Sequence, residues 1–213
     1  MNKIIPPRLT WNKIRNIAID ARNELLPDPD DIPVPIEEII EFKLGMSIEP
    51  KTFLKEEYGI DGQILGDLST IMIDNKLYSD ERYLPRVRFT LAHELGHYYL
   101  HKKQIKAAKF SSIEEWTKVL QNTSDQDSIW FERQADEFAG SFLVPINTLV
   151  KLIEDERNKI ELFLKKSKSE ELHEKAIYGI SINLCRKFNV SYKVIETRIN
   201  QEKIWDELGF YNI

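Results

Sequence analysis

The stretch RFTLAHELGHYYLH, residues 88–101, decides the fold of this chain. It contains the pattern His-Glu-x-x-His, with His93, Glu94 and His97 at the fixed positions. Residues four apart on an α-helix lie one turn apart on the same face, so His93 and His97 can direct two imidazoles at one ion. Glu94 lies beside them and can reach the open side of that ion as a general base. The pattern therefore predicts a helix that binds one zinc ion (Zn²⁺) next to a catalytic glutamate.

The residues around the motif indicate that one side of the same helix is buried. Apolar or small residues recur there at helical spacing, namely Phe89, Ala92, Leu95, Gly96, Tyr99 and Leu100. Glycine inside a helix costs about 1 kcal/mol relative to alanine. The glycine at position 96 therefore suggests that another backbone or a substrate approaches closely. The alternative, an exposed helix with unrelated histidines, does not account for the apolar stripe.

Composition limits the class of protein. Hydrophobic residues make up 42% of the 213 residues and charged residues 31%, which predicts a folded globular protein. The net charge of −5 argues against DNA binding by the chain itself. Cys185 is the only cysteine, the N-terminus lacks an apolar signal-peptide core, and no apolar run approaches the ~20 residues of a membrane span. We therefore expect a cytoplasmic protein without membrane association.

Periodicity and turn residues predict a mostly helical α+β fold with a small sheet, and the His-Glu-x-x-His motif adds the expectation that this sheet packs on a zincin-like pair of helices. Helices are expected over residues 10–26, 35–45 and 84–102, and strands over 46–53 and within 61–74. After the motif helix we expect a short amphipathic helix around residues 113–120, a mobile loop at 122–128, a helix over 130–143 and a long exposed helix over 147–168.

The C-terminal part is expected to be helical, and residues 180–199 outline a helix-turn-helix. Residues 1–145 are therefore predicted to form the zinc domain and residues 146–213 a helical C-terminal region. The basic residues of the outline are accompanied by acidic ones, including Glu196, Glu202 and Asp206. This balance favours packing or docking of a protein partner over DNA binding.

A third protein ligand is expected, because catalytic zinc sites have three protein ligands and one open position. The segment FERQADEFAG, residues 131–140, carries Glu132 and Asp136 one turn apart, among small residues that allow close helix packing. Glu132 is the expected ligand, and Asp136 is expected to accept the spare N–H of a ligand histidine. Glu137 is the alternative ligand, although it points to another face of the helix.

The sequence does not determine which group would stabilise a developing oxyanion. Tyr98, Tyr99, His101 and His173 can all be considered. Tyr99 can equally be a core residue, and His173 a surface residue. For His101, we favour a position behind one of the metal ligands or on the substrate side of the site.

Two of these stretches, taken together, resemble a known family. TLAHELGHYYLH (residues 90–101) followed by FERQADEFAGSFLVP (residues 131–145), with IPVPIEEII (residues 32–40) upstream, closely resembles the ImmA/IrrE metallopeptidases. Val144 stands where that family usually has methionine, a departure without mechanistic weight.

The resemblance implies a cytoplasmic zinc endopeptidase. It implies that His93, His97 and Glu132 bind zinc and that Glu94 is the catalytic base. It also implies that the enzyme cleaves or inactivates a regulatory protein, a helix-turn-helix repressor, in a stress response, in phage or mobile-element induction, or in a toxin–antitoxin pair.

Two other functions are weighed against this one. In the first, the chain is a non-proteolytic module whose structural zinc site holds a repressor and changes the repressor's affinity for DNA. Glu94 argues against it, because a pure binder has no need of a general base. In the second, the chain binds DNA directly as a regulator, which its acidic charge disfavours.

Overall fold

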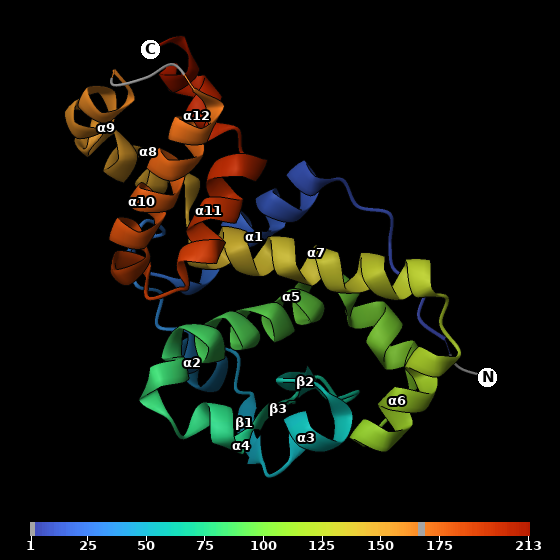
Figure 1. Cartoon of the computed structure of the whole chain (residues 1–213). Coiled ribbons are helices and arrows are strands. Elements are labelled where there is room, and N and C mark those ends of the chain that lie inside the picture. The colour runs from blue at the N-terminus through green and yellow to red at the C-terminus, as the bar shows by residue number, and fades with distance from the viewer. Residues whose placement is uncertain (1–2, 166–168) are drawn as a thin grey trace. The chain divides into compact units, whose positions relative to one another are not determined.

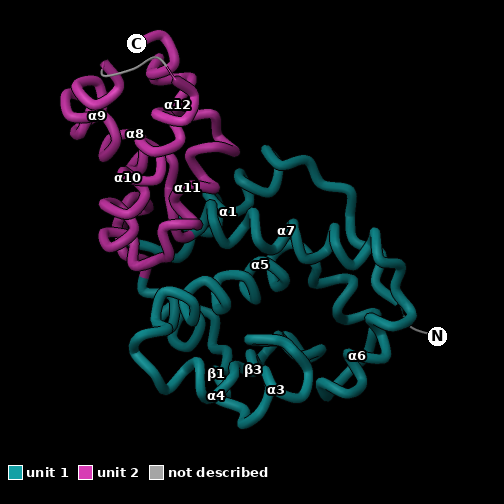
Figure 2. Tube along the Cα trace, viewed as in Figure 1, with its two compact units in different colours: residues 1–27, 35–142 teal, residues 28–34, 143–213 magenta. Residues whose placement is uncertain are grey.

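The fold was taken from a computed structural model that describes residues 3–165 and 169–213 (Figure 1). Two compact units are distinguished (Figure 2). Unit 1 comprises residues 1–27 and 35–142, and unit 2 comprises residues 28–34 and 143–213. The assignment of separate roles to residues 1–145 and 146–213 stays a prediction. The mostly helical α+β fold with a small sheet is confirmed.

Unit 1 contains a three-stranded sheet with the strand order β1-β3-β2. β1 (Ser47–Lys51) runs parallel to β3 (Thr70–Asp74), and β2 (Gly62–Ile64) pairs antiparallel with β3. In the central strand, Ile71 and Ile73 are completely buried, as the two-residue period of a strand requires for its core face. The predicted strands are therefore present.

The helices of unit 1 follow local sequence signals. They are α1 (Trp11–Leu25), α2 (Ile36–Glu38) continuing into the π-helix η1 (Ile39–Lys43), α3 (Leu54–Tyr58), α4 (Asn75–Tyr78), the 3₁₀-helix η2 (Glu81–Tyr83), α5 (Leu84–Ala108), α6 (Ile113–Gln121) and α7 (Asp125–Leu143). Side-chain oxygens of Thr10, Asp74 and Ser112 cap α1, α4 and α6. Such caps fix where these helices begin.

Two predicted boundaries in unit 1 are wrong. α5 continues to Ala108, six residues beyond its predicted end, because Ile105 and Ala108 extend its buried side. The predicted loop at residues 122–128 is already helical from Asp125. Ser124 explains the early start, because its hydroxyl accepts a hydrogen bond from the Asp127 N–H at 3.2 Å and so caps α7.

The helices α5 and α7 touch at a glycine. A Cβ atom on Gly96 would lie 3.1 Å from both the Cα and the carbonyl oxygen of Ala135. Only a residue without a side chain lets the two backbones come so close. The close partner expected at Gly96 is therefore the backbone of α7, and α5 and α7 run side by side in Figure 1.

The regular elements of unit 2 are all helices in the part of it that the structure describes, and residues 28–34 form an irregular connection. Unit 2 contains α8 (Ile146–Asp155), α9 (Arg157–Leu164), α10 (Glu170–Phe188), α11 (Tyr192–Gln201), α12 (Ile204–Glu207) and the 3₁₀-helix η3 (Phe210–Asn212). α10 and α11 are joined by a tight turn in which Asn189 is left-handed, with φ 53°. The predicted helix, turn and helix are therefore present.

The single long exposed helix predicted over residues 147–168 is wrong. α8 and α9 are separate helices with a break at Glu156, and Leu149 and Ile153 are completely buried. The Arg157 guanidinium binds Glu154 and the Leu208 carbonyl oxygen at the break. Residues 166–168 of that prediction lie outside the described residues. Among the helices described, none has the length and apolar character that crossing a membrane requires.

Candidate metal centre

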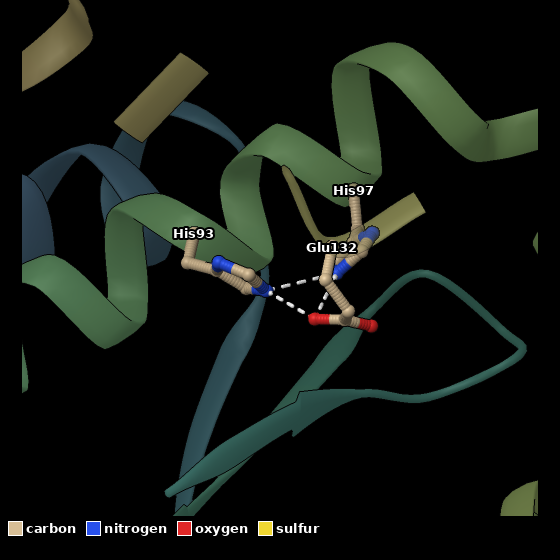
Figure 3. A group of neighbouring side chains, drawn as sticks. All are labelled: His93, His97 and Glu132. Atoms are coloured by element: carbon tan, nitrogen blue, oxygen red, sulfur yellow. Dashed lines mark hydrogen bonds and ion pairs between the residues drawn. The ribbon is translucent and has the colours of Figure 1, made fainter. Parts of the chain in front are cut away.

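The helices α5 and α7 bring the three predicted ligands together. His93 and His97 come from α5 and Glu132 from α7, and one ligand atom of each lies within 4.8 Å of the others. Figure 3 shows both imidazole rings directed toward the Glu132 carboxylate. His93 Nε2 is 3.0 Å from Glu132 Oε2 and 3.0 Å from His97 Nε2, and His97 Nε2 is 3.7 Å from Glu132 Oε2. The three side chains therefore face one common point.

Asp136 lies behind the first of these histidines, where the sequence places it. Its Oδ1 atom is 2.8 Å from His93 Nδ1. A carboxylate accepts, so His93 Nδ1 carries the hydrogen and the Nε2 atom faces Glu132 and His97. Burial lowers the pKa of His93, but hydrogen bonds to Asp136 and Glu132 outweigh it and raise this pKa well above its ordinary value. A proton on His93 is thus favoured where no cation is bound.

Glu94 is buried close to the two histidines. The backbone N–H of Ile64, in β2, donates a hydrogen bond of 2.7 Å to Glu94 Oε2. Burial raises the pKa of the Glu94 carboxyl, and the neighbouring His97 and His93 lower it by less. A carboxyl with a raised pKa can both take up and release a proton near neutral pH.

The donor set at the common point fits a zinc ion. With both histidines neutral and protonated on Nδ1, two Nε2 lone pairs and a carboxylate oxygen lie together, and each of these atoms can only accept. Three acceptors at such distances need a shared cation or proton between them. Two imidazole nitrogens and one carboxylate oxygen are a usual ligand set of catalytic zinc, which leaves a fourth position open.

Glu137, the alternative ligand, lies on another face of α7. Its carboxylate Oε1 accepts a hydrogen bond of 2.5 Å from Arg15 Nε on α1, and only 3% of its side chain is exposed. A buried carboxylate paired with a guanidinium is costly to separate from that partner, so Glu137 does not serve as a metal ligand in this arrangement. The structure thus places Glu132, and not Glu137, beside the histidines.

The candidates for oxyanion stabilisation have different surroundings. Tyr99 stacks on Phe138 with ring centroids 5.5 Å apart, and burial raises the pKa of Tyr99 to about 12. Tyr98 lies under the Lys102 ammonium, which is 4.9 Å from the ring centroid. His173 is buried inside unit 2, where its Nδ1 accepts a hydrogen bond of 3.1 Å from Trp205 Nε1, so the surface position predicted for it is wrong.

His101 is completely buried directly behind His97. Its Nδ1 atom is 2.9 Å from His97 Nδ1. Burial and the nearby His97 lower the pKa of His101 to about 3, so its imidazole is neutral at physiological pH. The structure therefore places His101 behind a predicted ligand, as its helical spacing of four from His97 allows.

Three participants escape the sequence reasoning. The Ile64 N–H is a backbone group, which side-chain patterns do not reveal. Phe131 stacks on both His97 and His101 at 4.2 Å, and Gln134 accepts from His101. Both residues belong to the FERQADEFAG segment, and their spacing of three, which places them together on one face of a helix, is the signal that the sequence offers.

Comparison with known proteins adds a family match. A model of the family described as Peptidase_M78, IrrE N-terminal-like domain, matches residues 77–200. No curated protein matches the chain. Among solved structures, a Mycobacterium tuberculosis transcriptional regulator is 14% identical with a TM-score of 0.43, and the match covers 88% of this chain and 51% of that one. The chain thus spans about half the length of that structure.

Proposed function

This chain belongs to the Peptidase_M78 family, the IrrE N-terminal-like peptidases, and from this membership we propose that it is a zinc-dependent endopeptidase. We propose further that it cleaves or inactivates a regulatory protein, with a helix-turn-helix repressor as the substrate class. A stress response, phage or mobile-element induction, or a toxin–antitoxin pair would be the setting. The observation that carries the enzymatic part is the convergence of His93, His97 and Glu132 beside the buried Glu94.

Three side chains would hold the ion in this proposal. They are His93 and His97 through their Nε2 atoms and Glu132 through its carboxylate. A zinc ion bound there would supply Lewis acidity for the scissile carbonyl and would lower the pKa of a bound water to about 7. Asp136 keeps the N–H of His93 on Nδ1, so that the lone pair of Nε2 points at the ion.

Glu94 would move the proton. The Ile64 N–H holds Glu94 Oε2, which fixes the orientation of the whole carboxylate. Glu94 takes a proton from the attacking water and then delivers it to the nitrogen of the leaving amine. Burial supports both steps, because it raises the pKa of this carboxyl toward the pH at which the enzyme works.

The regulatory substrate rests on family membership. Its test is co-expression or incubation of the chain with the helix-turn-helix protein encoded nearest its gene, followed by gel analysis and mass spectrometry of fragments. We expect the wild type to cleave that protein. Glu94→Gln should bind zinc as the wild type does and lose at least about 100-fold in cleavage rate, since general acid–base catalysis contributes that much or more.

Glu81→Gln is the matched control, because Glu81 is an exposed glutamate in η2 of the same unit. It should cleave like the wild type. Full cleavage by Glu94→Gln would refute the proposed role of Glu94. If instead neither protein cleaves and both change the repressor's DNA affinity equally, the non-proteolytic binding module is the correct function.

A further inference from the structure

A line of buried hydrogen bonds continues from His97 away from the candidate metal centre. His97 Nδ1 is 2.9 Å from His101 Nδ1, and His101 Nε2 is 3.1 Å from Gln134 Oε1. Gln134 Nε2 in turn donates to the Pro7 carbonyl oxygen at 2.6 Å. The side chains of His101 and Gln134 are completely buried. Four groups from three separate parts of unit 1 are thus connected.

The direction of every hydrogen in this line follows from its far end. The Pro7 carbonyl can only accept, so Gln134 turns its NH₂ group toward Pro7 and its Oε1 toward His101. Gln134 Oε1 can only accept, so the hydrogen of His101 lies on Nε2. His101 is completely buried, which disfavours a charge on its ring, so the imidazole that donates through Nε2 accepts at Nδ1. His97 Nδ1 must therefore donate, and its Nε2 keeps a free lone pair.

From this geometry we propose that Pro7, Gln134 and His101 form a relay that fixes His97 in the tautomer able to bind zinc through Nε2. His101 is then a positioning residue for the ligand His97. The proposal rests on the proposed zinc site, but it concerns groups that do not touch the ion. With the opposite tautomer, an N–H group of His97 would point at the ion and block coordination.

The relay also fixes the ring of His97 in space. Phe131 stacks on His97 and on His101, with both centroid distances 4.2 Å and interplanar angles of 26° and 27°. One short segment of α7 therefore has three roles. Glu132 is a ligand in the proposed site, the ring of Phe131 packs on two histidines, and the amide of Gln134 orients His101. A shift of α7 would disturb all three together.

The two ligand histidines are oriented by different chemistry. His93 donates to the carboxylate of Asp136, whose side chain is 55% exposed, whereas His97 donates to a neutral imidazole that is buried. Glu132, Asp136 and Glu94 already place three carboxyl groups around the two histidines. A further carboxylate behind His97 would add a buried negative charge, which is costly. A neutral relay orients His97 without that cost.

The tautomers can be measured in the wild-type chain by long-range ¹H–¹⁵N correlation spectra of ¹⁵N-labelled histidine. The chain has only four histidines, so substitution of each assigns the signals. In the zinc-free protein we expect the hydrogen of His97 on Nδ1 and that of His101 on Nε2. Zinc should shift the Nε2 signals of His93 and His97 and leave the His101 tautomer unchanged. A hydrogen on Nδ1 of His101, or only on Nε2 of His97, would overturn the relay.

A pair of substitutions tests whether the relay supports metal binding. His101→Gln keeps an acceptor for His97 and a donor for Gln134, whereas His101→Leu removes both. Zinc affinity, measured by competition with a chelator, should fall about 10- to 100-fold in His101→Leu. It should stay close to the wild-type value in His101→Gln. Equal affinity in all three proteins, or an equal loss in both variants, would contradict the proposal.

Gln134→Leu tests the hydrogen bond between Gln134 and His101. Without the amide oxygen of Gln134, His101 is free to change its tautomer. We expect a weaker zinc affinity and a mixture of the two His101 tautomers. A single unchanged His101 tautomer in this variant would contradict the relay. Should a leucine variant fail to fold, the wild-type spectra decide the question. If zinc does not shift the His93 and His97 signals, the proposed zinc site is refuted. The tautomers measured in the zinc-free protein would still test the relay.

Discussion

In unit 1, buried polar groups lead from the Pro7 carbonyl through Gln134 and His101 to His97, and they end at acceptors that face one another. In unit 2, the described buried bonds are isolated pairs: His173 accepts from Trp205, and the Ser181 hydroxyl donates to the carbonyl oxygen of Ile177. Both units bury polar side chains. Among the described residues, the group of His93, His97 and Glu132 in the first unit brings three possible metal ligands to a common point, which is the basis of the proposed zinc site.

The strongest test of this contrast removes a ligand. His97→Ala deletes one of the two nitrogen ligands. It should weaken zinc binding by more than the about 100-fold that is lost when a residue hydrogen-bonded to a ligand is removed. Zinc content after dialysis and chelator competition would measure the loss. His173→Ala, in unit 2, is the matched control and should keep the wild-type zinc affinity. Retention of zinc by His97→Ala would show that the ion binds elsewhere.

The pH dependence of zinc binding sharpens the contrast. The pKa of His93 is raised above its ordinary value of 6.5 in the zinc-free protein, and its proton competes with zinc for Nε2. Affinity should therefore be highest above this raised pKa and fall about tenfold for each pH unit below it, beginning above pH 6.5.

Asp136→Asn provides the control for that titration. It replaces the carboxylate whose hydrogen bond raises the pKa of His93 with a weaker, uncharged acceptor, so the fall in zinc affinity should begin at a lower pH. Calorimetric titrations in buffers of different ionisation enthalpy would count the released protons. Zinc binding without release of a proton at pH 6 would contradict the assignment.

In unit 2 the same kind of substitution should affect stability alone. His173→Leu leaves the buried Trp205 N–H without an acceptor, which should cost about 1–3 kcal/mol of unfolding free energy. Urea titration would measure this cost, and zinc affinity should not change. A zinc-binding defect in a folded His173→Leu variant would break the distinction between the two regions.

The smallest expected effects come from two helical glycines. Gly179→Ala in α10 meets no atom within 4 Å, so it should stabilise by about 1 kcal/mol. Gly96→Ala forces a Cβ against the Ala135 backbone, and crowding of about 1–3 kcal/mol offsets the same helical gain. The net change at Gly96 should be a destabilisation of up to about 2 kcal/mol with weaker zinc binding. Equal stabilisation by both substitutions would contradict the close crossing of α5 and α7.

Local spacing explains what the sequence could predict. His93 and His97 are four residues apart, as are Glu132 and Asp136, and helical geometry alone places each pair on one face. The relay depends instead on Gln134 meeting the carbonyl of Pro7, 127 residues away along the chain. Every residue has a carbonyl group, so no sequence pattern marks that contact.

The errors have similar physical causes. A polar run such as residues 122–128 resembles a loop in sequence, and this hides the start of α7, where Ser124 caps the helix. The break between α8 and α9 is stabilised by Arg157 bound to the Leu208 carbonyl, a partner distant in sequence. The bond from the Ile64 N–H to Glu94 depends on the path of β2, which the identity of residue 64 does not determine.

A crystal structure of the zinc-loaded protein, with anomalous data collected on both sides of the zinc absorption edge, tests the central claim most directly. We expect one anomalous peak, with His93 Nε2 and His97 Nε2 about 2.0–2.1 Å from the ion and a Glu132 oxygen about 2.0–2.2 Å from it. A peak at other residues, or none at these three in protein that contains zinc, would contradict the account.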